Sequence, residues 1–117
     1  MVVLCLESAV SFIKLVTIYI KEHSTATFSE LEKVFNPALQ GSLGVIRSVN
    51  YIREKGIEEK RYFMKDDELL CSADGIPFAV CSQWGIGNTP NIVNLAKQLG
   101  YVITTTSEAS ALASVNP

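Results

Sequence analysis

The stretch LLCSADGIPFAVCS, residues 69–82, contains the clearest turn signal of the chain. An Asp-Gly pair beginning at Asp74 is typical of a tight hairpin turn, and the apolar runs on both sides of it predict two antiparallel strands. A loop over residues 73–75 places Cys71 opposite Pro77. We therefore expect a β-hairpin whose register is set by this turn.

Both faces of this hairpin are apolar. Successive strand residues point to opposite faces. One face carries Leu69, Cys71, Ala79 and Cys81, and the other carries Leu70, Phe78 and Val80. We expect other elements to cover the hairpin on both sides, and we expect Pro77, which has no N–H to donate, to lie near an edge or a bulge.

Helical spacing dominates the chain before the hairpin. Residues 8–23 are predicted to form a largely buried helix, because their few polar side chains line up as one narrow stripe. Thr27 and Glu30 have the spacing of a capping box, in which each side chain satisfies a backbone N–H of the other residue. This second helix is expected to end near Phe35, since the residue before Pro37 is disfavoured in the α region.

The segment between Ser42 and Gly56 is predicted to form a third helix. Ser42 can cap its N-terminus, apolar residues recur at helical spacing, and Gly56 can close it. Residues 45–52 are rich in β-branched side chains that alternate imperfectly, so a strand over these residues is the alternative.

A helix and a strand are predicted after the hairpin. Thr89 supplies an N-cap, Pro90 occupies the first helical position, and Gly100 closes the helix. Residues 101–105 then read as a strand. With the strand at 76–82 it forms either a right-handed βαβ unit or an antiparallel arrangement.

These elements predict an α+β domain with three N-terminal helices, a β-hairpin, a C-terminal helix and a short strand. The 117 residues, 48% of them hydrophobic, suit one domain with its own core. We place the domain at 1–106, with a helical part over 8–56 and a hairpin-containing α/β part over 61–105. Residues 107–117 are expected to be a flexible tail.

The element order of residues 8–82 resembles a winged helix-turn-helix. In that family the third helix enters the major groove of DNA and the hairpin contacts the backbone. The resemblance implies that the polar side of the third helix faces the groove. These residues are Ser42, Arg47, Ser48, Asn50 and Arg53.

The charge distribution allows a local phosphate-binding surface. The chain has 12 acidic and 10 basic residues, a net charge of −2, so the whole molecule is not a polycation. Residues 47–65 nevertheless hold six of the ten basic residues against three acids, although an acidic triplet at 66–68 follows. The nucleic-acid contacts expected besides the groove-facing residues are Lys55, Lys60, Arg61 and Lys65. Double-stranded DNA is the expected partner, and an acidic protein is the alternative.

A glycine-containing loop is the second candidate site. It lies between an apolar strand and a helix N-terminus, an arrangement that turns backbone N–H groups toward an anion. The ligand-binding residues of this alternative are Trp84, Gly85, Gly87, Asn88 and Thr89. Pro90 stands where a G-x-G-x-x-G pattern needs its third glycine, and no Walker lysine follows. A structural turn with Trp84 in the core is therefore the competing interpretation.

No catalytic residue, metal site or cofactor is predicted. The cysteines Cys5, Cys71 and Cys81 lack metal-ligand spacing, and His23 is the only histidine. We expect the three thiols to be free and buried, which suits a cytoplasmic location.

The apolar first helix leaves an assembly role open. Glu7 and Lys14 interrupt it, which argues against a membrane span. Its apolar surface could instead form a homodimer interface. The favoured function is a small non-catalytic binding module, DNA-binding or regulatory. The alternatives are a phosphate-ligand or enzymatic domain that uses the Gly85–Thr89 loop, and a structural assembly module.

Overall fold

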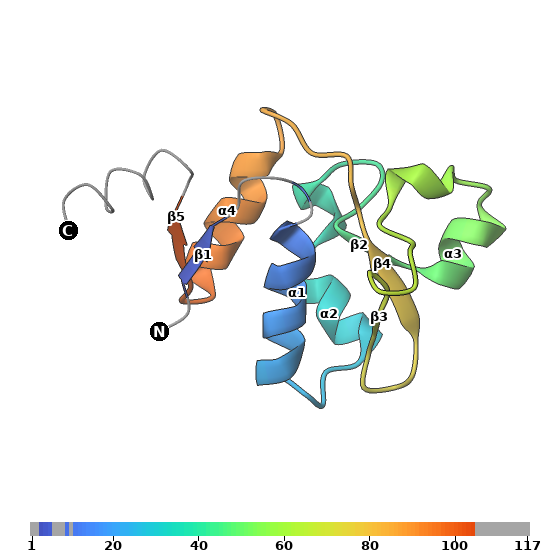
Figure 1. Cartoon of the computed structure of the whole chain (residues 1–117), viewed down its shortest axis with the longest axis horizontal. Helices are drawn as coiled ribbons and strands as arrows, with labels where there is room; N and C mark the ends of the chain where they lie inside the picture. Colours follow the sequence, from blue (N-terminus) through green and yellow to red (C-terminus); the bar gives the residue numbers. More distant parts are fainter. Residues whose placement is uncertain (1–2, 6–8, 10, 105–117) are drawn as a thin grey trace.

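A computed structural model of the chain describes residues 3–5, 9 and 11–104 (Figure 1). Helices and strands are mixed along the chain, which confirms the predicted α+β class. The elements are β1 (Val3–Cys5), α1 (Ser11–Glu22), α2 (Phe28–Val34), the 3-10 turn η1 (Pro37–Leu39), β2 (Ile46–Ser48), α3 (Val49–Glu54), the 3-10 turn η2 (Glu59–Arg61), β3 (Leu70–Cys71), β4 (Pro77–Val80), α4 (Thr89–Gln98) and β5 (Val102–Thr104).

The predicted hairpin forms with the predicted register. β3 and β4 are antiparallel with Cys71 opposite Pro77, and the Ser72 N–H donates to the Ile76 carbonyl at 3.1 Å. Pro77 is the first residue of β4, a position that tolerates a missing N–H.

Strand β4 is the middle strand of a three-stranded antiparallel sheet with the order β2-β4-β3. Its Phe78 and Val80 are fully buried in the main core with residues of α1 and α2. Ala79 and Cys81 point to the other face, where they join a smaller cluster that includes Ile52 of α3. The predicted coverage of both hairpin faces is confirmed.

The first two helices follow their sequence signals. α1 buries Phe12, Leu15, Val16 and Tyr19 against the core. α2 begins with the predicted capping box: the Thr27 N–H donates to Glu30 Oε1 at 3.0 Å, and the Glu30 N–H donates to Thr27 Oγ1 at 3.3 Å.

The third helix does not begin at Ser42. Residues Ile46–Ser48 instead form β2, which pairs antiparallel with β4, and α3 starts at Val49. The pairing leaves Val45 and Ile46 fully buried beside β4, so tertiary packing overrides local helical spacing. A strand therefore separates α2 from α3. The prediction of three consecutive helices is wrong at this point.

The last strand also pairs differently from the prediction. β5 runs parallel to β1, with Leu4 opposite Ile103, in a separate two-stranded sheet beside α4 (Figure 1). It does not join β4, because β2 and β3 already occupy both edges of that strand. Ile92 and Ala96 of α4 pack in the main core with Leu4 and Tyr101.

Three further expectations concern exposure and boundaries. Cys81 is free and buried as predicted, but Cys71, also free, is exposed because it lies on an outer strand. The side chain of Cys5, residues 8 and 10 of the predicted first helix, and the predicted tail at 107–117 lie outside the described residues, and Ala9 lies in a turn before α1. Within the described part of the chain, every helix is too short or too polar to cross a bilayer.

Candidate functional site

Arg47, the central residue of the predicted groove contact, is built into the fold. Its Nη1 lies 3.4 Å from Glu32 Oε2, its Nε donates to the Leu43 carbonyl at 3.3 Å, and its Cζ lies 4.8 Å from the centre of the Tyr51 ring. The side chain is only 17% exposed. These contacts tie β2 to α2, and they leave the guanidinium little capacity for a phosphate.

The other groove-facing residues do not share one helix face with Arg47. Ser42 lies in the loop before β2, whereas Asn50 and Arg53 lie on α3. The Ser48 hydroxyl is used as the N-cap of α3, where it accepts a hydrogen bond from the Tyr51 N–H at 3.1 Å.

Three exposed basic side chains are paired with carboxylates. Arg53 Nε lies 3.6 Å from Glu59 Oε1. Lys60 Nζ lies 3.1 Å from one oxygen of Glu58, and Arg61 Nη2 lies 3.8 Å from the other. Because of these pairs, the surface carries positive and negative charges side by side.

The remaining two basic residues do not change this balance. Lys55 lies with its Nζ 5.9 Å from the centre of the Tyr51 ring, and Lys65 is exposed directly before the acidic triplet at 66–68. Residues 47–68 hold six basic and six acidic residues, so the surplus over 47–65 is cancelled. A phosphate backbone is bound by net positive surface, which this region lacks.

The hairpin tip is held against the protein. The Asp74 carboxylate accepts from the Phe28 N–H of α2 at 3.0 Å, and the Ala73 N–H donates to the Ala26 carbonyl at 3.0 Å. The turn residues 73–75 stay exposed, but the Asp74 carboxylate and the Ala73 N–H are used to hold the turn against the start of α2.

The loop before α4 uses its backbone donors internally. The Gly85 N–H donates to Asn88 Oδ1 at 2.8 Å, the Thr89 N–H to the Gly85 carbonyl at 2.9 Å, and the Asn91 N–H to the Asn88 carbonyl at 3.0 Å. These three N–H groups are therefore not free for an anion, and Pro90 adds no donor.

Trp84 belongs to the core side of this loop. Its Nε1 donates to the Cys81 carbonyl at 2.7 Å, and its ring meets Phe12 edge to face with centroids 4.8 Å apart. Trp84 is half-buried and packs against both core clusters, so the fold accounts for this ring without a ligand.

Nucleophiles and metal ligands are dispersed over the described residues. No group of three or more His, Cys, Asp or Glu side chains within them could hold a metal ion. Burial raises the pKa of the Cys81 thiol, which disfavours the reactive thiolate. His23 directly follows α1, and its Nδ1 lies 3.0 Å from the carbonyl of Tyr19 on that helix.

A surface that the site predictions covered only in part, at Ser42, Gly85 and Gly87, is formed by two uncharged runs of sequence, 34–46 and 75–96. The Gln40 side chain donates to the Gln83 carbonyl at 2.8 Å, Asn88 Nδ2 donates to the Gln40 carbonyl at 3.0 Å, and Asn91 Nδ2 donates to the Leu39 carbonyl at 2.9 Å. These bonds join η1 to the loop before α4. We call the exposed residues here the uncharged surface: Ala38, Gly41, Ser42, Gln83, Gly85, Ile86, Gly87, Pro90 and Asn91.

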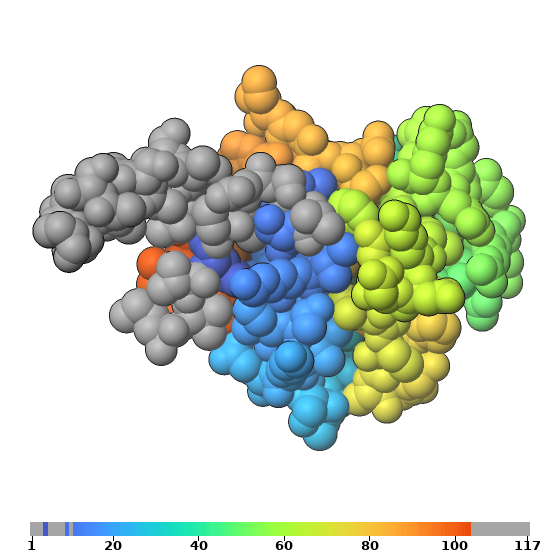
Figure 2. All heavy atoms as spheres, in the orientation of Figure 1, coloured from blue at the N-terminus to red at the C-terminus, as the bar shows by residue number. Residues whose placement is uncertain are grey.

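Ile86 is the most exposed large apolar side chain of the uncharged surface. It is 98% exposed. The loop before α4, to which Ile86 belongs, stands out from the molecule (Figure 2). Gly85 and Gly87 on either side add no side chain that could cover it. The charge-free runs are visible in the sequence, but their contact with each other is not.

The comparisons with known proteins leave the surface geometry as the basis for function. Neither a family model, nor a curated protein, nor a solved structure matches the chain.

Proposed function

We propose that the chain is a non-catalytic protein-binding module that docks a folded partner through the uncharged surface. The observation that carries the proposal is the exposure of Ile86, 98%, on a loop whose backbone is held by hydrogen bonds. A β-branched apolar side chain held in water on an ordered loop is poised to enter a pocket with little loss of conformational entropy.

The surroundings of Ile86 define the partner's chemistry. Side-chain amides, including those of Gln83 and Asn91, surround the loop, and no charged residue lies in 75–96. Interface centres are depleted of charge and are ringed by polar groups. The partner should therefore present an apolar pocket with an uncharged, hydrogen-bonding rim.

The test begins with a photoreactive side chain at position 86, which captures the partner covalently. The purified partner is then titrated against the wild-type chain and Ile86→Ser. Burial of an isoleucine side chain stabilises a complex by about 1.5–3 kcal/mol, so this variant should bind at least about tenfold more weakly. Val102→Ser is the matched control, because Val102, at 38%, is the other large exposed apolar residue among those that the structure describes.

Salt and folding readouts separate the alternatives. Raising salt from about 50 to 200 mM should change the affinity little, whereas duplex binding would weaken steeply. Ile86→Ser should keep the wild-type stability, since the side chain contacts water. Two outcomes would overturn the proposal. One is that wild-type and Ile86→Ser bind the purified partner equally well, and the other is that the chain binds duplex DNA in a salt-sensitive way through Arg53 and Lys55.

A further inference from the structure

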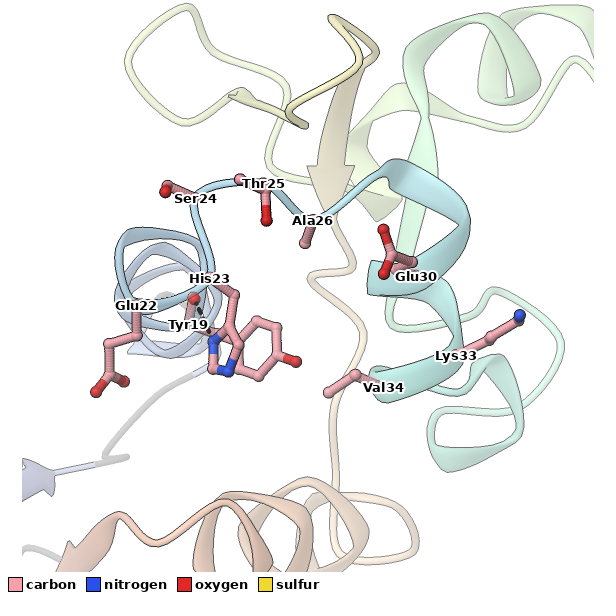
Figure 3. Close-up of a pocket in the computed structure, with 9 residues that line it drawn as sticks. All are labelled: Tyr19, Glu22, His23, Ser24, Thr25, Ala26, Glu30, Lys33 and Val34. Atoms are coloured by element: carbon pink, nitrogen blue, oxygen red, sulfur yellow. Dashed lines mark hydrogen bonds between the residues drawn. The ribbon is translucent and has the colours of Figure 1, made fainter.

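A cleft of about 550 Å³ lies between the last turn of α1 and helix α2 (Figure 3). Tyr19 and His23 form one wall, Val34 faces them, and Glu30 and Lys33 lie along the rim. The volume is in the range of small-ligand sites. This cleft is separate from the uncharged surface, and none of its lining residues belongs to that surface.

Tyr19 contributes a polar group, its hydroxyl, to the cleft, while the rest of its side chain is buried. The residue is 9% exposed, and its ring packs edge to face on Phe35 and stacks on His23 with centroids 4.0 Å apart. Its hydroxyl points into the cleft (Figure 3). No hydrogen-bond partner for this hydroxyl exists among residues 3–5, 9 and 11–104, so its capacity is available to a ligand.

His23 adds an acceptor next to this hydroxyl. Its Nδ1 lies 3.0 Å from the Tyr19 carbonyl, which can only accept, so Nδ1 carries the proton. In the neutral ring, Nε2 is then an acceptor. The cleft wall thus offers acceptors to a molecule that brings N–H donors.

Charge near the cleft also favours a cation. Of the charged lining residues, Glu22 and Lys33 point their charged groups away from the cleft, which leaves the carboxylate of Glu30 at its rim (Figure 3). The C-terminal end of α1 adds the negative end of a helix dipole. The Tyr101 hydroxyl donates to Oε1 of Glu22. Glu30 uses its Oε1 in the capping box, so its Oε2 remains as the counter-charge for a cation.

We propose that this cleft binds the ammonium or guanidinium group of a small organic cation. The Tyr19 hydroxyl and His23 Nε2 accept its N–H groups, the carboxylate of Glu30 balances its charge, and the stacked rings provide an aromatic wall beside it. Its alkyl part lies against Val34.

The experiment is an NMR titration of the full chain with n-butylguanidinium, followed at the backbone amides of residues 19–26 and 30–34. A saturable shift with a dissociation constant of about 1–10 mM is expected for a ligand with so few atoms. n-Butanol and butyrate have the same alkyl chain without the cation, and they should not produce it. An acetylated and amidated Gly-Arg-Gly peptide distinguishes the source: tighter binding than butylguanidinium indicates a partner's side chain, and equal binding a free molecule.

Variants assign the binding to the named groups. Tyr19→Phe removes only the hydroxyl and should weaken binding about fivefold, the value of one hydrogen bond. Glu30→Gln keeps the capping box, which accepts Gln, but removes the charge and should weaken binding similarly. Glu54→Gln on α3 is the control. The proposal is overturned if the cation gives no saturable shift, if butyrate binds equally well, or if Tyr19→Phe and Glu30→Gln both bind like Glu54→Gln.

Discussion

The carboxylate of Asp74 accepts a hydrogen bond from the backbone N–H of Phe28 at 3.0 Å, across 46 residues of sequence. Phe28 is the first residue of α2, so the hairpin turn supplies a negative group to a helix N-terminus. The Ser72 hydroxyl donates to the same carboxylate. Hairpin and helix are therefore coupled, and disruption of the turn should be felt by α2.

Asp74→Ala should lower the stability of the fold and loosen the start of α2. Asp74→Asn should lower it less, because the amide oxygen can still accept from Phe28. Urea denaturation followed by circular dichroism measures both changes. Equal stability of wild-type and Asp74→Ala would show that the contact contributes nothing.

The same carboxylate should make stability depend on pH. The Ser72 hydroxyl and then the Phe28 amide lower the pKa of Asp74 from its ordinary 3.8. Since the folded-state pKa is the lower one, this contribution is complete above the unfolded value and is lost as the pH falls through the lowered value. Wild-type should thus lose more stability than Asp74→Asn between about pH 5 and pH 3. Parallel pH profiles would contradict this expectation.

Alanine substitution should destabilise the fold more at Arg47 than at Arg53. Arg47→Ala removes the contacts with Glu32, Leu43 and Tyr51 and should cost about 1–2 kcal/mol of unfolding free energy. The Arg53 side chain is 65% exposed, so Arg53→Ala should lower the unfolding free energy by less than about 0.5 kcal/mol. Urea midpoints compare the two. If both variants lost only a little stability, Arg47 would be a surface residue, as the sequence predicted.

Local signals explain which elements could be predicted. The Asp-Gly turn fixes the register of β3 and β4, and Thr27 with Glu30 marks the start of α2, because each signal acts over a few residues. Strand β2 could not be predicted in the same way. Its stability comes from pairing Arg47 with Ala79, a partner far along the chain.

The candidate site was less predictable for the same reason. Basic residues counted along 47–65 look like one patch, but ion pairs with Glu58 and Glu59 and the burial of Arg47 are tertiary facts. The uncharged surface likewise depends on the contact of Gln40 with Gln83. Sequence shows the runs without charge, and only folding shows that they meet.

Trp84→Phe should test the core position of the single tryptophan. The substitution keeps an aromatic ring near Phe12 but removes the Nε1 donor, which leaves the Cys81 carbonyl without that partner. Loss of such a bond costs about 1–2 kcal/mol. The measurement is urea denaturation followed by circular dichroism. If Trp84→Phe were as stable as wild-type, the Nε1 hydrogen bond would contribute nothing to the stability of the fold.

Glycine substitutions should separate a strained turn from an ordinary one. Gly44 has φ of +76°, and an added Cβ would lie 2.8 Å from Arg47 Nε, so Gly44→Ala should cost about 1–2 kcal/mol. Gly85 and Gly87 lie outside the left-handed region, with no atom within 4 Å of an added Cβ. Alanine there should leave stability unchanged or raise it by about 0.4–1 kcal/mol, because it restricts the unfolded chain.

The urea midpoints of the three glycine variants decide how the loop before α4 is used. A docking loop that presents Ile86 gains from a stiffer backbone, so Gly85→Ala should bind the captured partner as well as wild-type. An anion-binding loop needs close approach of its bare backbone to the ligand. Two results would contradict the docking role of Ile86. Gly85→Ala could lose as much stability as Gly44→Ala, or it could fail to bind inorganic phosphate that the wild-type binds. Either result would mean that the loop requires glycine for a ligand.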